Sequence, residues 1–257
     1  MVRSFLRFGL VSSLVLSSVA FASGCEDDPA KGKTAATVGS AVPVEAPKPA
    51  ASAVASAGAA IGSAVAGAGS AAGSAIAAAG TAASAAMVVA GTPYTINETN
   101  SKVGFVGAKI TGKHVGSFQK FAGTIDLVGG KAETSKVTID IDMASLKTDQ
   151  EKLDTHLKSK DFFAVDTFPK AHFVSTSIVA GGANGATHTI TGNLELHGVT
   201  KSIGFPAKIS IAADGVTATA EFTINRKDFG ILYPGKVDDL IKDDVVITLT
   251  IKGTKAN

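Results

Sequence analysis

The sequence predicts an all-β domain, an antiparallel barrel or sandwich of about eight strands, over residues 92–257. The first observation is alternation. From Lys136 to Met143 the odd-numbered residues from Val137 onward are apolar, which is typical of a strand with one buried face. The second is recurrence, because similar patterns occur at 187–196, 205–211, 216–224 and 245–251, separated by turn pairs at 129–130, 181–182, 197–198 and 214–215. The third is the near absence of helical periodicity.

One segment, 149–159, departs from this pattern and predicts a short helix. Thr148 followed three positions later by Glu151 is a capping-box pattern, and Leu153 and Leu157 would share one helical face. Pro169 then favours an extended entry into the next strand. We expect this helix to close one end of a barrel, with the phenylalanines that follow it lining whatever the barrel encloses.

Glycines inside the predicted strands bear on whether the interior is filled. They are Gly104, Gly107, Gly116, Gly123, Gly192 and Gly204. Some are expected at bulges or barrel corners, and others are expected to leave interior volume empty. A barrel of about eight strands can be filled by side chains or can hold one small ligand. The glycines favour the second alternative.

Residues 1–24 are typical of a secretory signal. Arg3 and Arg7 precede an apolar segment over 8–22, which is too short to span a bilayer comfortably. Two processing sites compete. The sequence Ala20-Phe21-Ala22 predicts cleavage after Ala22, whereas residues 22–25 resemble a bacterial lipobox.

The lipobox alternative predicts cleavage before Cys25 and a lipid on its thiol. Cys25 is the only cysteine of the chain, so no intrachain disulfide can form. Two or three acyl chains would anchor the protein firmly, whereas a single chain is marginal. We expect a protein exported across the inner membrane to the periplasm and held there as a membrane-anchored lipoprotein.

Residues 25–91 predict a low-complexity linker. Four prolines mark an extended stretch within 26–53, and 54–86 holds three successive blocks of eleven residues rich in Ala, Gly and Ser. An eleven-residue period is close to three helical turns, so a helical spacer and an unstructured linker both remain open. Either would hold the C-terminal domain away from the membrane. The composition is too weakly apolar for a transmembrane helix.

Charge and aromatic content argue against nucleic-acid binding. The net charge is +2, two of the positive charges lie in the signal segment, and the chain has no Trp and two Tyr. A nucleic-acid-binding surface needs a basic stripe, which this sequence lacks.

Several short segments occur together and in a specific order. The most informative is His156-Leu-Lys-Ser-Lys-Asp-Phe-Phe163, followed by Phe168-Pro169 and Phe173. It is accompanied by 101–105, 116–118, 121–123, 192–200, 225–230 and 243–249. With these segments the domain resembles the bacterial YceI-like family of polyisoprenoid-binding, lipocalin-like secreted proteins, over nearly all of residues 92–255.

The resemblance implies an antiparallel up-and-down barrel of extended lipocalin-like shape. Its cavity would hold a long apolar chain, such as an isoprenoid quinone or a polyprenyl lipid. Each buried CH₂ contributes about 0.8 kcal/mol, so a few prenyl units would suffice for binding. No other cofactor is expected, the membrane is the second expected partner through the anchor, and the oligomeric state is open, a dimer included.

The candidate ligand-binding residues are of two kinds. The apolar candidates are Phe105, Phe118, Phe121, Phe162, Phe163, Phe173, Leu194, Ile203, Phe222 and Phe229. Ordinary core packing is the alternative for each. The polar candidates for a headgroup are His114, His156, His172, Arg226 and Asp228. For Arg226 a salt bridge to Asp228 or Asp244 is the preferred alternative, and His156 is expected to hold the helix onto the barrel.

The sequence carries no pattern typical of a metal or catalytic site. The five histidines show no metal-ligand spacing such as H-E-x-x-H, and the lone cysteine lies in the signal region. We therefore expect a carrier or sequestering protein and no enzyme. The first alternative is an envelope-stress or interaction module with a packed barrel, and the second is an enzyme that modifies a bound lipid.

Overall fold

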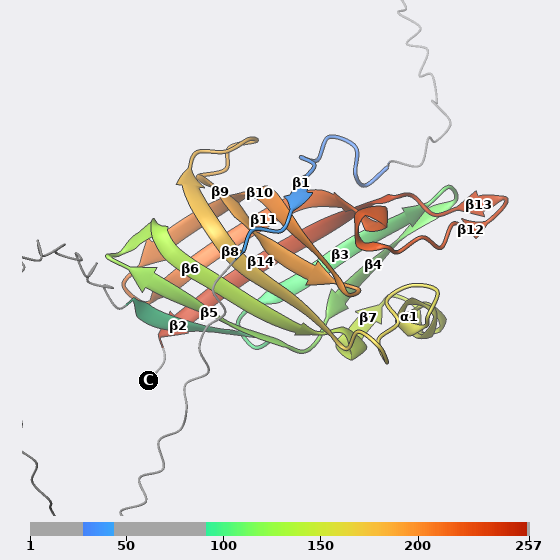
Figure 1. Ribbon diagram of the computed structural model, residues 1–257, viewed down its shortest axis with the longest axis horizontal. Coiled ribbons are helices and arrows are strands. Elements are labelled where there is room, and N and C mark those ends of the chain that lie inside the picture. Colours follow the sequence, from blue (N-terminus) through green and yellow to red (C-terminus); the bar gives the residue numbers. More distant parts are fainter. Residues whose placement is uncertain (1–27, 44–90, 256–257) are drawn as a thin grey trace, which may run out of the picture.

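The computed structural model describes residues 28–43 and 91–255, and nearly all of its regular structure is β (Figure 1). The helices are α1 (Glu151–Lys158) and the 3-10 turns η1 (Met143–Ser145) and η2 (Arg226–Phe229). In the described ranges no helix has the length and apolar character needed to cross a membrane. The strands are β1 (Thr37–Ser40), β2 (Thr92–Asn97), β3 (Lys102–Lys109), β4 (Gly112–Phe118), β5 (Phe121–Val128), β6 (Lys131–Asp142), β7 (Leu146–Thr148), β8 (Lys170–Ala180), β9 (His188–Leu196), β10 (Val199–Ala212), β11 (Gly215–Asn225), β12 (Gly235–Lys236), β13 (Asp239–Leu240) and β14 (Asp244–Lys255).

The strands close into an eight-stranded antiparallel barrel. Three of its members are each built from two shorter strands in line. β2 and β3 lie in line and both pair with β14. On their other side β5 pairs with β2 and β4 pairs with β3, so β5 and β4 also lie in line. β6 then pairs with β5, and β7 pairs with β4. From there β8, β9, β10, β11 and β14 follow in chain order and return to β2. Each of the eight barrel members thus neighbours the next one along the chain, which confirms the predicted up-and-down barrel.

Two hairpins have turns that require left-handed backbone. His197 and Gly198 join β9 to β10 with φ of 52° and 73°, and Gly129 and Gly130 join β5 to β6 with φ of 62° and 70°. Positive φ at both central residues matches the right-handed twist of the flanking strands. The turn pairs predicted from glycine therefore set these two registers.

Helix α1 forms where it was predicted, but its capping differs. Gln150 is the N-cap, and no side chain caps the helix. Thr148 cannot serve as the cap because it belongs to β7 and pairs with Gly116 of β4. Instead, the backbone N–H and the hydroxyl of Thr148 donate to Asp154 Oδ1 at 2.6 and 2.7 Å. The predicted capping box is therefore wrong, and a buried carboxylate holds the helix to the strand in its place.

Gly116 and Gly192 do not leave empty interior space, contrary to the sequence-based expectation for such glycines. A Cβ at Gly116 would lie 2.2 Å from Cζ of Phe105, and one at Gly192 would lie 2.4 Å from Cζ of Phe173. In both cases a phenylalanine ring from the neighbouring strand covers the glycine. These glycines therefore make room for the aromatic rings that stand inside the barrel.

Replacing Gly192 by Ala is expected to destabilise the barrel by about 1–3 kcal/mol, because the new methyl group overpacks the interior. The Cβ would meet the backbone oxygen of Val174 at 2.5 Å as well as the Phe173 ring. Urea unfolding measures the change. Gly107→Ala is the matched control, since a Cβ at that strand position meets nothing within 4 Å. Equal stability of the two variants would contradict the prediction.

Residues 28–43 lie on the barrel, although the sequence assigned them to a linker. Backbone pairing between β10 and β11 extends from their shared turn only as far as Lys208 and Thr219. Beyond these two residues the strands separate. β1 pairs with β10 in this gap, and Ala35 bridges to Thr223 of β11. The amide of Asn193, which is buried, bonds both the N–H and the carbonyl of Val42. The signal segment and the eleven-residue repeats lie outside the described residues.

Candidate ligand-binding cavity

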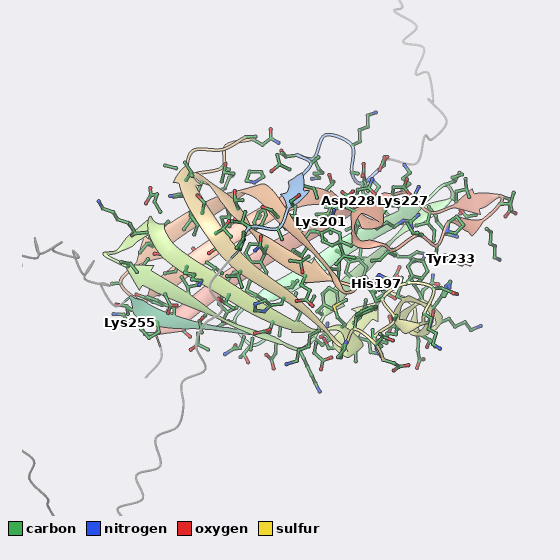
Figure 2. All side chains as sticks on the ribbon, in the orientation of Figure 1. His197, Lys201, Lys227, Asp228, Tyr233 and Lys255 are labelled. Atoms are coloured by element: carbon green, nitrogen blue, oxygen red, sulfur yellow. The ribbon has the colours of Figure 1, made fainter. Side chains whose placement is uncertain are left out.

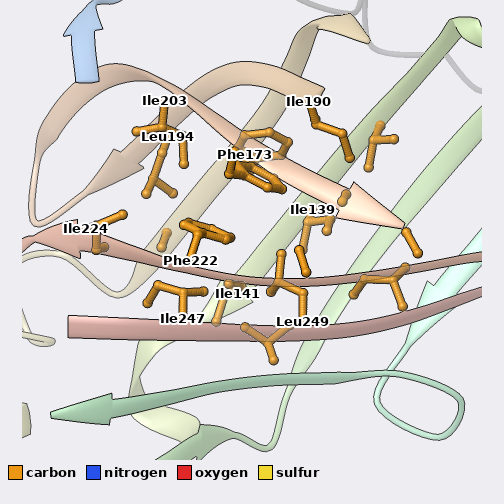
Figure 3. A pocket seen from close by; sticks show the side chains of 18 of the residues that line it. Ile139, Ile141, Phe173, Ile190, Leu194, Ile203, Phe222, Ile224, Ile247 and Leu249 are labelled. Carbon is orange, nitrogen blue, oxygen red and sulfur yellow. The ribbon is translucent and has the colours of Figure 1, made fainter. Parts of the chain in front are cut away.

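The barrel encloses an apolar cavity of about 190 Å³. All eight barrel members contribute to its wall, and Figure 3 shows aliphatic and aromatic side chains converging on it. The alternation of each strand explains this, because every second residue points inward. The wall residues labelled in Figure 3 are Ile139, Ile141, Phe173, Ile190, Leu194, Ile203, Phe222, Ile224, Ile247 and Leu249.

Aromatic rings stiffen one side of the wall. Phe205 of β10 and Phe222 of β11 stack with ring centroids 4.2 Å apart and planes 11° apart. Phe173 of β8 packs on Phe205 at 5.9 Å. Such pairs add about 0.5–1.5 kcal/mol beyond the apolar area they bury. They also bridge the region where β10 and β11 are not hydrogen-bonded to each other.

The structure places eight of the fifteen candidate ligand-binding residues on the cavity. These eight are Phe105, Phe118, Phe163, Phe173, Leu194, Ile203, Phe222 and Arg226. Whether they contact a ligand stays a prediction, because the position of a side chain alone does not test binding. Sequence reasoning favoured aromatic residues and so missed most of the aliphatic wall, such as Ile190, Ile247 and Leu249. The strand alternation could have identified these residues, because each occupies an inward-pointing position of its strand.

Three predicted phenylalanines lie in packed core away from the cavity wall. Phe121 belongs to the core group that includes Ile96 and Ile125, and Phe229 is fully buried in η2. Phe162 is buried beneath α1, where its ring contacts His156 at 5.0 Å and Tyr233 at 5.1 Å. Phe121 is the first residue of β5, whereas Phe162 follows a helix and Phe229 ends a 3-10 turn, so strand alternation does not apply to the last two.

The predicted headgroup histidines are on the outer surface. His172 points away from the cavity because it precedes the inward Phe173, and its Nδ1 lies 2.8 Å from Asp140 Oδ1. His114 Nδ1 lies 3.0 Å from Asp149 Oδ1. His156 contacts the Tyr233 ring edge-on at 5.1 Å, so it links α1 to the segment after η2, where Figure 2 labels Tyr233.

Arg226 touches the cavity, but its guanidinium group is bound elsewhere. The side chain is 5 % exposed. Its nitrogens donate to the carbonyls of Ile231 at 2.6 Å and Lys242 at 3.2 Å, and to Asp243 Oδ1 at 3.0 Å. The salt-bridge partner is thus Asp243, whereas the sequence suggested Asp228 or Asp244. The guanidinium holds the chain after η2 against the barrel.

The ionisable side chains of the described residues bear on a possible metal site and on the attachment of helix α1. Across 28–43 and 91–255 no three His, Cys, Asp or Glu side chains gather as a metal site would require. The pKa of Asp154 reflects two opposing effects: burial disfavours the carboxylate, but hydrogen bonds from Thr148 and the nearby Lys147 outweigh burial and lower it. The carboxylate form is therefore the one that fixes α1.

Acid is expected to loosen α1 through this carboxylate. Because the folded-state pKa of Asp154 is lowered, its contribution is fully present above the ordinary Asp pKa of about 3.9 and is lost as pH falls through the lower folded value. Thermal unfolding of the parent chain and of Asp154→Asn between pH 7 and pH 2 measures this. The two melting temperatures should differ at pH 7 and converge in acid. A constant difference would contradict the assignment.

The chain is similar to a known protein family and to proteins of two Pseudomonas species. A family model described as a YceI-like domain matches residues 94–253. A UPF0312 protein of Pseudomonas fluorescens is 36% identical over 136 residues, covering 51% of this chain and 70% of that protein. A UPF0312 protein of Pseudomonas putida is 35% identical over 138 residues, covering 51% and 71%.

Two solved structures share the fold at low sequence identity. Burkholderia cenocepacia BcnA aligns with a TM-score of 0.55 and 24% identity, over 62% of this chain and 99% of that chain. A polyisoprenoid binding domain from Saccharophagus degradans, implicated in plant cell wall breakdown, aligns with a TM-score of 0.51 and 16% identity, over 63% and 98%.

Proposed function

Because this chain belongs to the YceI-like domain family, we propose that its barrel binds a long-chain apolar amphiphile, a polyisoprenoid or isoprenoid quinone, as an envelope carrier or sequestering protein. The apolar cavity supports this proposal above all, since a packed interaction module would need a filled interior. The polyisoprenoid binding domain of Saccharophagus degradans, which has the same fold, supports the ligand class.

The size of the cavity sets how much of the ligand it can enclose. One water occupies roughly 10–15 Å³ on this measure, so 190 Å³ accommodates on the order of a dozen non-hydrogen atoms, or roughly two to three prenyl units. Burying these carbons would contribute roughly 10 kcal/mol, against about 4–15 kcal/mol for lost translational and rotational freedom. A longer tail therefore extends toward an end of the barrel or displaces wall side chains.

The proposed location of the protein is the cell envelope. The signal-like residues 1–24 and the lipobox-like residues 22–25 support export and a lipid on Cys25, which would make the protein a membrane-anchored lipoprotein of the periplasm. The buried core, the hydrogen-bonded guanidinium of Arg226 and the outward histidines support a binding role without catalysis.

Native mass spectrometry of the full chain purified from bacteria tests the proposal, followed by solvent extraction and mass identification of anything released. The full chain is needed because residues 28–43 form part of the folded unit. A stoichiometric prenyl or other long-chain species is the expected result. A chain that carries no lipid and takes up neither added quinone nor added polyprenol would overturn the proposal and favour an interaction module.

A further inference from the structure

One end of the barrel carries a cluster of exposed apolar side chains. The turn between β3 and β4 presents Ile110, the loop between η2 and β12 presents Leu232, and the β12–β13 hairpin presents Val237 and Leu240. Their exposed fractions are 58, 64, 97 and 44 %. We call these four residues the apolar tip, and Figure 1 shows the β12–β13 hairpin at the extremity of the molecule beside the β3–β4 turn.

The apolar tip is held together by hydrogen bonds between its two hairpins. The N–H of Ile110 donates to the carbonyl of Leu240 at 3.1 Å. The N–H and the hydroxyl of Thr111 both donate to Asp239 Oδ1, and Lys109 forms a salt bridge to the same carboxylate. Contacts between the two hairpins thus hold the exposed apolar side chains of this end in place. Exposed apolar clusters on an otherwise polar surface mark contact sites.

The N-terminal part of the chain arrives at the same end. Asp28, the first described residue, forms a salt bridge to Lys242 at 2.7 Å, and Lys242 lies two residues after Leu240. The backbone N–H of Lys242 donates to the carbonyl of Ala108, two residues before Ile110. In Figure 1 the segment from residue 28 begins on the side of β1 that faces the β12–β13 hairpin.

This attachment limits how far the barrel can stand from an N-terminal anchor. Cys25 lies three residues before Asp28, and an extended chain spans at most about 3.6 Å per residue, so the two are within about 11 Å. The repeats of 54–86 come after residue 43, which is already docked. With an anchor on Cys25, the repeats would therefore follow the docked segment and would not separate the barrel from the membrane, unlike the spacer that the sequence suggested.

We propose that the apolar tip contacts the lipid bilayer, so that the barrel stands on the membrane with its β3–β4 and β12–β13 end facing the lipid. Three lysines, Lys109, Lys113 and Lys236, against Asp238 and Asp239 leave one net positive charge there, which suits anionic headgroups. The cavity residue Ile231 precedes Leu232, so in this orientation one end of the cavity lies on the side of the barrel that faces the bilayer, the source of an apolar ligand. The inference goes beyond the proposed lipid binding but rests on the proposed N-terminal anchor.

Single tryptophans test the orientation, because the chain has none of its own. The two reporters are Val237→Trp in the apolar tip and Val179→Trp near the β8–β9 turn, at the opposite end, where the valine is 58 % exposed. Each full-length variant is reconstituted with vesicles of phosphatidylethanolamine and phosphatidylglycerol that contain brominated acyl chains. Emission from position 237 should shift to the blue and be quenched severalfold more than emission from position 179. Equal quenching, or none at position 237, would overturn the proposal.

Two controls separate this inference from the anchor and from self-association. The intact mass of the purified chain shows whether Cys25 carries lipid. A missing anchor is therefore detected without using the tryptophan signal. In a Cys25→Ala background, Val237→Asp with Leu232→Asp should reduce vesicle flotation more than tenfold, whereas Val179→Asp should not. If the shift at position 237 occurs without vesicles and grows with protein concentration, the apolar tip pairs with a second copy and the proposal is wrong.

Discussion

Replacing Ala220 by Trp is expected to abolish copurification of any long-chain lipid while the barrel remains folded. Ala220 of β11 lines the cavity together with Ala218 and Phe222, the inward residues on either side of it. An indole at this position would fill the space that the ligand tail needs. Because the group enters existing empty volume, the usual overpacking cost of about 1–3 kcal/mol should be largely avoided. Native mass spectrometry and thermal unfolding of the full chain measure the two effects.

Thr219→Trp is the matched control for this substitution. Thr219 is adjacent on the same strand but faces outward, where it is exposed and pairs with Lys208 and Thr250. The control should retain bound lipid at the parent stoichiometry. If the Ala220→Trp chain still carries lipid at that stoichiometry, the ligand does not occupy the barrel interior.

Replacing Arg226 by Ala is expected to lower the free energy of unfolding by about 3 kcal/mol, the lower end of the range for breaking a buried ion pair, because Asp243 is partly exposed. The change removes the donors to the carbonyls of Ile231, Ile241 and Lys242. The free energy of unfolding falls because these carbonyl oxygens are left without hydrogen-bond donors. Urea unfolding measures the loss, and hydrogen exchange of residues 231–243 should show where it acts.

Lys227→Ala isolates the role of burial in that effect. Lys227 also forms a salt bridge to Asp243, at 2.8 Å, but its side chain is half-exposed. Its removal should change stability by about 1 kcal/mol or less. If Arg226→Ala instead weakened lipid binding without destabilising the chain, the guanidinium would act as a headgroup ligand, the alternative that the sequence left open.

Much of the fold could be predicted because it depends on local signals. The alternation from Val137 to Met143 set which side chains face inward, and each of its odd-numbered residues lines the cavity. The pairs 129–130 and 197–198 supplied the left-handed turns that two of the hairpins need. The position of α1 also followed from local spacing, although its cap did not, since Thr148 was already engaged in the β4–β7 pairing.

The candidate site was only partly predictable. Strand alternation placed Phe173, Leu194 and Phe222 on the cavity, whereas Phe162 and Phe229 lie outside the strands, where no such rule applies. The sequence missed the partner of Arg226 by one residue, Asp244 in place of Asp243, because the guanidinium is positioned by backbone carbonyls of an irregular loop that no residue pattern indicates. Gly116 and Gly192 were misleading, since a glycine can either leave a space empty or admit a neighbouring ring, and only the strand register distinguishes the two.

The sequence by itself determined an all-β domain, the inward face of its strands and the family to which the domain belongs, because these follow from the spacing of residues close together in the chain. Only the tertiary structure decided that β2 closes on β14, that β1 docks in the gap between β10 and β11, and that a cavity remains. These contacts join segments more than a hundred residues apart. Their formation depends on how side chains from all eight barrel members fit together, which no local pattern records.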